Sequence, residues 1–555
     1  MMGKNRRVIA AVVGVAVVAI IVGAFFLTPR PPPPPPPPAE KRIFRTTFPA
    51  PIYIDPGVGS DAASTTSMIS LYDTLVHPKV TGEMEPHLAE SWKASEDGLT
   101  WSFYLRRGVK FHDGKELTAE DVVFSTNRIL TLGTGFAHLY KPYIEKTEAA
   151  DKYTVQFKLK KKFGPFVSTL VRLFILNKDL VTKNIKTPGP YGEFGDYGKD
   201  WLVRNDAGSG PYMVKEFRVG EELVMERFKD SWVTVQPNAP DEVRFILTTE
   251  AVTVRTMIGR RELEISDPWQ TVENLKVMDE MKGVDVAIYV TGVGISYMMT
   301  HNRKPPTDDV HFRRAMILAF DYDAMVTQVS PDARKPRGVI PANLPGHNKK
   351  IPEYNRDLKK AMEELKKSKY YDKLDKYEVE LHWVAEVPLR EKIALLFASN
   401  MAEIGIKVKV VKVPWLSIID EMASMEKTPN LVVVSCGAAY MEVGSMLMQR
   451  FHSSSTKTWE QGEWLLNSTI DKMIEDAVET IDIESRFQKY QKIEEILEDM
   501  AVTIPLAMEP TRRAYQAYYV DWPVAKGQIC PLMGYEMEIR FIQVYPEKRR
   551  ELLAA

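Results

Sequence analysis

Alternating segments and amphipathic segments follow one another along most of the chain. Residues 101–105 and 153–159 are predicted to be strands, and polar and apolar side chains alternate strictly in the second. Residues 118–124 open a helix that Thr118 can cap, with Asp121 at the positive helix end. A late helix is predicted from apolar side chains at three- and four-residue spacing, namely Phe487, Tyr490, Ile493, Leu497 and Met500. This succession of strands and helices predicts an α/β protein.

Two glycine-containing segments mark breaks in this pattern. Gly405 is predicted to stop a helix that precedes a strand over residues 406–410. Residues 187–195 are rich in glycine and proline, which predicts a surface loop between two structural units.

The first 29 residues depart from the α/β pattern. A basic cluster precedes an uncharged apolar run over residues 8–27, and its length of about 20 residues matches a hydrocarbon core of about 30 Å. A cleavable signal peptide has a shorter apolar region and a small-x-small site, and neither this site nor a cysteine for lipid attachment follows the run. We therefore expect residues 1–29 to be an uncleaved membrane anchor, with the remaining chain on the extracytoplasmic face.

Residues 30–39 contain an unbroken proline run, Pro31 to Pro38. Such a run adopts the polyproline II conformation and forms a semi-rigid spacer. We expect a stalk that holds the folded part of the chain away from the membrane.

Length, charge and cysteine content restrict the class of protein. A chain of 555 residues with 45% apolar residues exceeds what one hydrophobic core supports, so two or more lobes are expected. The 74 acidic and 73 basic residues give no clustered positive field for nucleic acid. The only two cysteines, Cys436 and Cys530, exclude a disulfide framework; one bridge between them remains open, but we expect free thiols.

Motifs for catalysis or metal binding are absent from the sequence. There is no H-E-x-x-H, Walker A, G-x-S-x-G or metal-spaced Cys/His cluster. Gly292 and Gly294 lack the third glycine of a dinucleotide-binding loop, because Tyr297 stands in its place. We therefore expect no enzyme activity, no cofactor and no metal site.

A long succession of motifs carries a family resemblance. It runs through residues 88–92 (LAESW), 97–103 (DGLTWSF), 105–114 (LRRGVKFHDG) and 117–122 (LTAEDV), and further matches occur at 208–212 (GSGPY), 302–306, 313–321 and 404–406. Together these motifs resemble the family 5 extracellular solute-binding proteins, the oligopeptide- and dipeptide-binding receptors of ABC importers. The resemblance covers nearly all of the chain from about residue 44 to about residue 545.

The resemblance implies an α/β, two-lobed, periplasmic-binding-protein-like (type II) fold with an extra subdomain on lobe I. A ligand binds between the lobes, which close by hinge motion, and the permease subunits of an ABC importer recognise the closed, monomeric receptor. The implied layout is lobe I at 40–74, 200–300 and 506–555, the subdomain at 75–199, and lobe II at 301–505. The two chain crossings near His301 and Pro505 are the expected hinges.

One loop departs from the pattern of peptide-binding family members. Those members carry a glycine-tryptophan-x-alanine-aspartate-tyrosine loop in lobe II, and its aspartate pairs with the α-ammonium group of the peptide. The matching segment here places Ala439 at the aspartate position and Cys436 at the tryptophan position. A buried ammonium group needs an opposing charge, so Glu442 or Glu509 is a candidate substitute. Without a substitute, binding should not depend on a free ammonium group.

Three ligand classes therefore remain open: a peptide held through other groups, an oligosaccharide stacked on aromatic rings, and a nickel chelate or haem-like ligand, which nothing in the sequence favours. The candidate aromatic platforms are Trp269, Trp383, Trp415 and Tyr440. A surface sensor with the same fold is the alternative to an import receptor.

Overall fold

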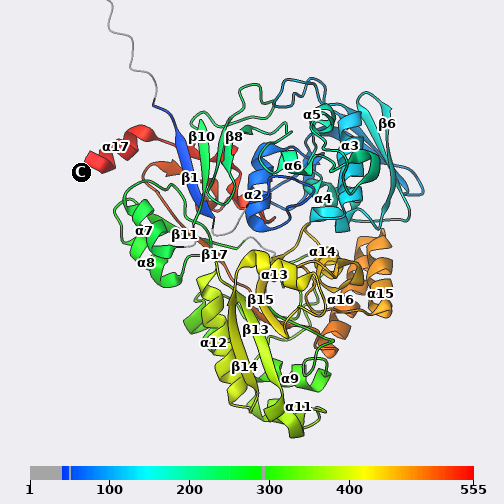
Figure 1. Cartoon of the computed structure of the whole chain (residues 1–555), viewed down its shortest axis with the longest axis vertical. Helices are drawn as coiled ribbons and strands as arrows, with labels where there is room; N and C mark the ends of the chain where they lie inside the picture. Colours follow the sequence, from blue (N-terminus) through cyan, green and yellow to red (C-terminus); the bar gives the residue numbers. More distant parts are fainter. Residues whose placement is uncertain (1–39, 49–51, 249, 291–293, 555) are drawn as a thin grey trace, which may run out of the picture. The chain divides into compact units, whose positions relative to one another are not determined.

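Two four-stranded sheets and one five-stranded sheet organise the part of the chain that the computed structural model describes (Figure 1). This part comprises residues 40–48, 52–248, 250–290 and 294–554. The predicted anchor (1–29) and stalk (30–39) lie outside it. Within the described ranges, no helix combines the length and the apolar character needed to span a bilayer.

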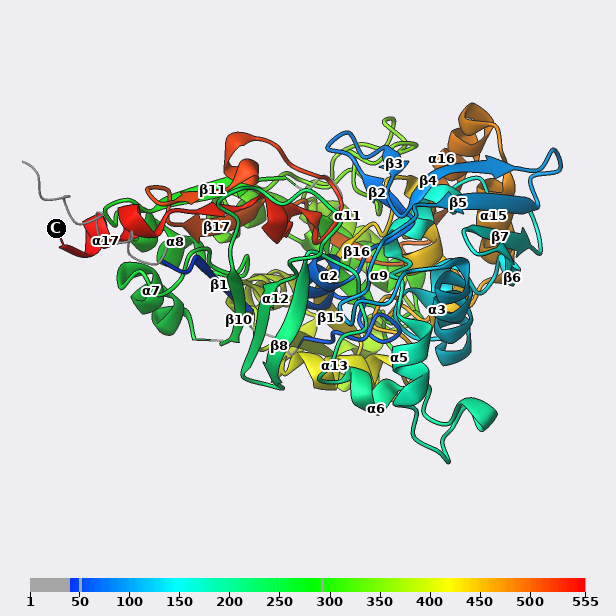
Figure 2. The same ribbon diagram turned by 90° about the horizontal axis from the view of Figure 1, so that it is seen from above.

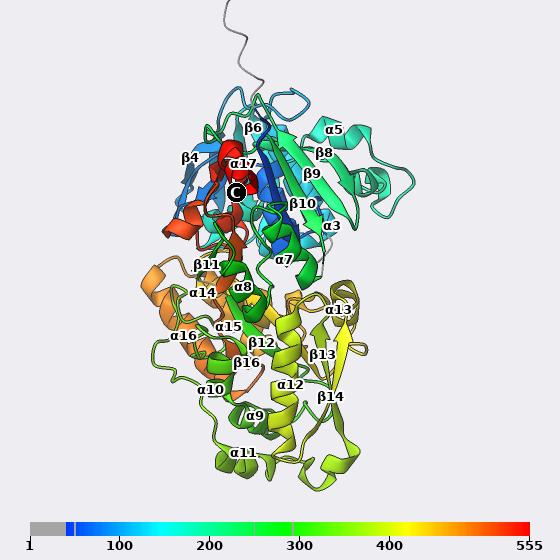
Figure 3. The same ribbon diagram turned by 90° about the vertical axis from the view of Figure 1, so that its left-hand side faces the viewer.

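The sheet of lobe I brings together strands from distant parts of the sequence (Figure 3). Its order is β1 (Ile43–Phe48), β10 (Glu242–Leu247), β9 (Glu222–Arg227) and β8 (Tyr212–Arg218). The first pair is parallel, and the other two pairs are antiparallel. Helix α2 (Ala62–Leu71) is almost entirely buried and packs against β8, so its N-terminus has a fixed position in lobe I.

The second four-stranded sheet lies within the predicted subdomain (Figure 2). It is antiparallel, in the order β4 (Ala89–Ala94), β5 (Thr100–Leu105), β7 (Thr154–Leu159) and β6 (Ile144–Asp151). Helix α3 (Ala119–Leu132) packs against β6 and β7, and a capping box of Thr118 and Asp121 starts it. Both strands and the helix start predicted from the sequence are confirmed.

The five-stranded sheet forms the centre of lobe II. Its order is β14 (Lys407–Val413), β13 (Glu378–Val384), β15 (Leu431–Gly437), β12 (Gly294–Thr300) and β16 (Ile504–Ala507). Strands β14, β13 and β15 run parallel, whereas β12 is antiparallel to both of its neighbours. Helix α12 (Pro388–Ala402) packs against β13 and β14 (Figure 1). The predicted late helix is confirmed as α16 (Ile483–Asp499), which packs against α15 (Ser468–Glu479).

Shorter elements connect these layers. The strands are β2 (Val76–Pro78), β3 (Met84–Pro86), β11 (Asp285–Tyr289), β17 (Thr511–Tyr515), β18 (Val520–Asp521) and β19 (Gln543–Val544). The helices are α4 (Phe166–Thr169), α5 (Lys178–Lys183), α6 (Lys199–Leu202), α7 (Ala251–Gly259), α8 (Val272–Asp279), α9 (Val310–Ala319), α10 (Tyr322–Ala324), α11 (Leu358–Leu365), α13 (Trp415–Met422), α14 (Val443–Met446) and α17 (Pro546–Ala554).

Strand pairing moves the two chain crossings away from their predicted positions. Strand β12 pairs along its whole length with β15, so residues 294–300 belong to lobe II and not to lobe I. His301 lies beyond this crossing, where its ring Nε2 is 2.9 Å from the carbonyl of Met425 in lobe II. At the second crossing, β16 extends to Ala507, and β17 then pairs with β11. The crossings thus lie between β11 and β12 and between β16 and β17, whereas the other predicted boundaries stay a prediction.

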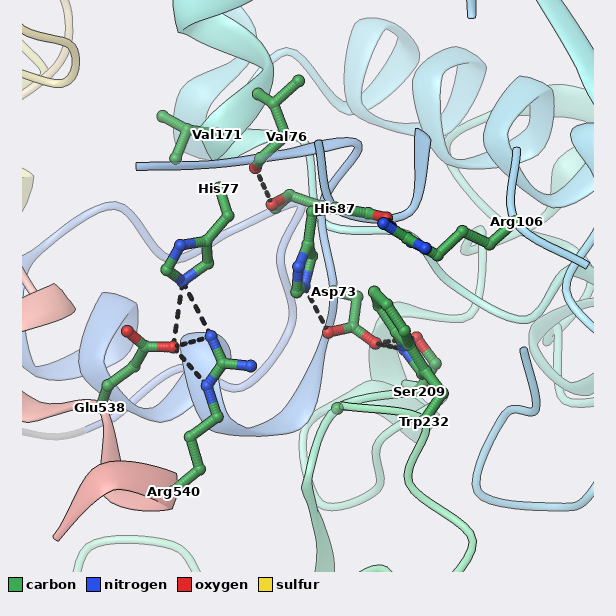
Figure 4. A network of polar contacts seen from close by, with 12 residues as sticks. Asp73, Val76, His77, His87, Arg106, Val171, Ser209, Trp232, Glu538 and Arg540 are labelled. Carbon is green, nitrogen blue, oxygen red and sulfur yellow. Dashed lines mark hydrogen bonds and ion pairs between the residues drawn. The ribbon is translucent and has the colours of Figure 1, made fainter. Parts of the chain in front are cut away.

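A buried polar network links β2 to the C-terminal segment (Figure 4). His77 Nε2 lies 3.0 Å from Glu538 Oε1, and Arg540 Nη2 lies 2.7 Å from the same oxygen. Nearby, His87 Nε2 lies 2.9 Å from Asp73 Oδ1. Burial raises the pKa of Glu538, but Arg540 and His77 outweigh this effect and lower the pKa to about 2. None of these five residues lines the two interlobe cavities described below.

Candidate ligand-binding cleft

Two adjoining cavities lie between lobe I and lobe II. Their volumes are about 230 and 130 Å³, so together they lie near the lower end of the roughly 300–1,000 Å³ typical of small-molecule sites. Seven residues line both cavities: Ala62, Trp269, Val387, Arg390, Ser435, Gly437 and Met533. Because these residues come from both lobes, the two cavities form one continuous interlobe cleft.

Arg390 places a buried positive charge on the wall of this cleft. It lies in the first turn of α12, which begins at Pro388, a residue well suited to a helix start. Its Nη1 donates to Ser296 Oγ at 3.1 Å, and its Nη2 donates to Ser435 Oγ. The side chain is only 5% exposed, and no described carboxylate forms an ion pair with it. Burial lowers the pKa of Arg390, and Glu509 opposes this effect.

The larger cavity carries further charged groups. Arg513 donates to the carbonyl of Ser266 at 2.9 Å, and Arg512 is 7% exposed with an Nε that has no partner among the described residues. Two carboxylates, Glu509 and Glu536, also line this cavity, and Oε1 of Glu509 is buried without a described partner. Burial raises the pKa of Glu536. Three arginines and two carboxylates therefore line this cavity.

The smaller cavity has the opposite character. Two carboxylates, Asp61 and Glu386, line it. Asp61 accepts hydrogen bonds from the backbone N–H and the hydroxyl of Ser64, both at 3.0 Å. Glu386 accepts a hydrogen bond from the backbone N–H of Trp415 at 2.9 Å. Burial raises the pKa of Asp61. Three tryptophan side chains complete the wall: Trp269, Trp415 and Trp459. This end combines acidic groups with aromatic surface.

Three of the predicted site residues line the two cavities, and their role in ligand binding stays a prediction. Trp269, Trp415 and Glu509 line the cleft. Trp383, in contrast, is buried in the core of lobe II and contributes to neither cavity. Trp383 is only 3% exposed, and the ammonium group of Lys412 lies over its ring.

The loop with Ala439 serves a structural purpose in this chain. The carbonyl of Ala439 accepts a hydrogen bond from Arg172 Nε at 3.1 Å, and Tyr440 is fully buried. Glu442 accepts from Arg486 Nε at 2.7 Å, which neutralises its charge within lobe II. None of Ala439, Tyr440 and Glu442 lines the cleft cavities. The predictions of Glu442 as an amine partner and of Tyr440 as a cleft wall therefore find no support in the lining of these two cavities.

Both cysteines are free and buried, as predicted. Cys436 lines the larger cavity, where burial raises the pKa of its thiol to about 12. It therefore presents a small neutral surface to the cleft.

The cleft residues that escaped sequence-based reasoning include Asp61, Glu386, Arg390 and Trp459, and also Arg512, Arg513 and Glu536. Asp61 has the pattern of a helix cap, and the charged residues near 386–392 have the pattern of a solvated helix start. An arginine two residues after a proline helix start that follows a buried strand was the one usable signal.

Comparison with known proteins places this cleft in context. The model of the bacterial extracellular solute-binding proteins, family 5, matches residues 83–458. The probable D,D-dipeptide-binding periplasmic protein of Escherichia coli is 28% identical over 82% of this chain and 86% of its own. The dipeptide-binding protein of the same organism is 26% identical over 86% of this chain and 90% of its own. A periplasmic binding protein from Helicobacter pylori, solved with the peptide STSA, shares the fold with a TM-score of 0.79 and 22% identity, covering 90% of this chain and 98% of that one. The chain belongs to family 5 of the bacterial extracellular solute-binding proteins.

Proposed function

We propose that this protein is an extracytoplasmic receptor that captures a short peptide between its lobes and delivers it to the permease subunits of an ABC importer. The observation that carries the proposal is the interlobe cleft, whose walls include Asp61, Glu386 and Arg390, three charged residues that form no ion pair with any residue that the structure describes. A zwitterionic ligand satisfies such a surface, because each ligand charge finds an opposite charge. The names of the relatives, which include dipeptide-binding proteins, support the same ligand class.

Closure of the lobes depends on groups that touch both of them. Across the mouth of the cleft, Lys392 Nζ of lobe II lies 2.7 Å from Glu273 Oε1 of lobe I. Both side chains are largely exposed, so this ion pair contributes little by itself. A peptide that contacts both lobes at once supplies the remaining free energy, and its differential affinity sets the population of the closed state.

The N-terminal segment determines where the receptor acts. We propose that residues 1–29 tether a monomer to the outer face of the membrane and that residues 30–39 act as the stalk. Alkaline extraction of membranes should leave the full chain in the pellet, with an intact mass that includes residues 8–27. A mature start near Glu40 would contradict the tether.

The ligand class is tested on the full chain purified in detergent. Mass spectrometry of small molecules released by denaturation identifies a ligand that co-purifies. Calorimetry then compares the dipeptide Ala-Phe with the disaccharide cellobiose. We expect binding of the dipeptide at micromolar concentration and none of the disaccharide. The reverse result would favour the oligosaccharide alternative and refute the peptide receptor.

A further inference from the structure

We infer that the smaller cavity is the amine subsite of the receptor, in which Asp61 and Glu386 hold the ligand's ammonium group among three tryptophans. The peptide then spans the cleft in one direction, with its carboxylate at the arginine-rich end. This inference rests on the proposed function and deepens it.

The first argument is the separation of charges along the cleft. Asp61 and Glu386 line the smaller cavity, and neither forms an ion pair with any residue that the structure describes. Arg390 is the one cation on this wall, and its guanidinium points to Ser296 and Ser435. Two carboxylates that share a small, partly buried space repel each other, and a cation between them relieves the repulsion. The larger cavity adds Arg512 and Arg513, beside the carboxylates Glu509 and Glu536, and these two arginines attract the carboxylate end of a zwitterion.

The second argument is the way in which the two carboxylates are held. Asp61 caps α2 through Ser64, and Glu386 accepts from the first N–H of α13. These bonds fix both side chains at helix starts, and each carboxylate oxygen keeps a further lone pair for a ligand N–H. An ammonium group has three donors, so it can satisfy both carboxylates at once. Each carboxylate is therefore held in place within its own lobe, and closure of the lobes brings the two together.

The third argument is the aromatic surround. The rings of Trp415 and Trp459 pack edge to face with centroids 5.2 Å apart, and Trp269 covers the lobe I side. Among the described residues, no lysine or arginine lies over these three rings. Tryptophan is the strongest aromatic partner for a cation, and the interaction strengthens when water is excluded. The same rings give an apolar surface to the first side chain of the peptide.

The subsite also explains how the chain can lack a carboxylate at position 439. Asp61 belongs to lobe I and Glu386 to lobe II, so an ammonium group between them contacts both lobes. Binding of the amine thus favours the closed state directly. A free amine should matter for affinity, in contrast to what Ala439 alone predicts.

The test measures discrimination between Ala-Phe and N-acetyl-Ala-Phe by calorimetry on the full-length protein. The variants are Asp61→Asn, Glu386→Gln and the double variant, because each keeps a capping oxygen but removes the charge. Glu484→Gln is the matched control, since this exposed carboxylate on α16 lies outside the cleft. Thermal melts verify that each variant folds like the wild type.

We expect the wild type to prefer the free amine by roughly 10- to 100-fold, the range that one charge-assisted hydrogen bond gives. In each single variant, the preference for the free peptide over the acetylated peptide should be about tenfold smaller than in the wild type. The Kd of the acetylated peptide should be unchanged. The control should match the wild type. Full discrimination in the double variant, or equal weakening of both ligands, would overturn the inference. Absence of binding of either peptide to the wild type would instead overturn the proposed function, and the orientation with it.

Discussion

Replacing Arg390 with methionine should weaken peptide binding and stabilise the empty receptor. The guanidinium is buried against two hydroxyl groups without a described counter-ion. In its absence, Ser296 and Ser435 keep each other as partners, because their Oγ atoms lie 2.8 Å apart. Exchange of a buried charge for an apolar side chain of similar length is often neutral or stabilising by about 1–4 kcal/mol. We expect a gain of roughly 1 kcal/mol, since the two lost hydrogen bonds offset part of the effect.

The effect on binding has the opposite sign. A guanidinium that pairs with a ligand carboxylate contributes on the order of 1.5–3 kcal/mol for each charge-assisted hydrogen bond. Arg390→Met should therefore raise the Kd for Ala-Phe by roughly 10- to 150-fold. The C-terminal amide of the same dipeptide should bind weakly to the wild type and no more weakly to the variant. Calorimetry on both proteins with both ligands gives the coupling energy, and chemical unfolding without ligand gives the stability.

Two results would refute this reasoning. A variant that still prefers the free carboxylate by the wild-type factor would show that the carboxylate binds elsewhere, for example at Arg512. A variant less stable than the wild type would show that the hydroxyl bonds outweigh the burial of the charge. Arg337→Met is the control, because Arg337 is exposed and pairs with Glu353 at 2.9 Å away from the cleft.

Three further predictions concern titratable groups outside the proposed ligand contacts. The pKa of the Glu538 carboxylate is lowered to about 2, so this group stabilises the fold above pH 4.5, its pKa in the unfolded chain, and the stabilisation is lost as pH falls towards 2. In the wild type, the free energy of unfolding should fall by up to ~3 kcal/mol through this group, and Glu538→Gln should remove that part of the fall. Urea titrations between pH 5 and 2 measure it. Burial raises the pKa of Glu498 to about 7, so stability should decline between pH 4.5 and 7, where the unfolded chain gives up this proton and the folded state keeps it; Glu498→Gln should abolish that decline in thermal melts, and an unchanged profile would contradict it. Burial raises the thiol pKa of Cys436 and Cys530 to about 12. Neither cysteine should therefore react with a thiol reagent at pH 8 until urea unfolds the protein. Rapid labelling of the folded protein would disprove their burial.

Local sequence signals predicted the elements of the fold because their causes are local. Thr118 and Asp121 form the capping box that their spacing predicted, and residues 100–105 and 154–159 pair as neighbouring strands. Gly405 has a φ of +81° directly before β14, which is the left-handed conformation that ends a helix. The positions of the chain crossings were less accurate, because the motifs that carried the layout do not show which lobe a strand such as β12 joins.

The binding site depended on tertiary structure, and sequence patterns described it only in part. Loss of the carboxylate at Ala439 was visible in the sequence, but its compensation was not. Asp61 and Glu386 are far apart in the chain, and each has an ordinary local explanation at a helix start. Only the apposition of the two lobes places both carboxylates in one cavity with Trp415 and Trp459.

The distribution of these groups between the lobes suggests an order of events. Arg390 rests on Ser296 of β12 and Ser435 of β15, so its position is fixed within lobe II. Glu386 is fixed by α13 of the same lobe. In the proposed binding mode, lobe II alone can therefore hold both ends of a zwitterion while the cleft is open. Lobe I then adds Asp61 and Trp269, and this second set of contacts exists only in the closed state. Removing the charge of Glu386 or Arg390 in lobe II should accordingly lower the affinity of the open receptor for the ligand. Removing the charge of Asp61 in lobe I should instead reduce the ligand-induced decrease in radius of gyration that small-angle scattering detects.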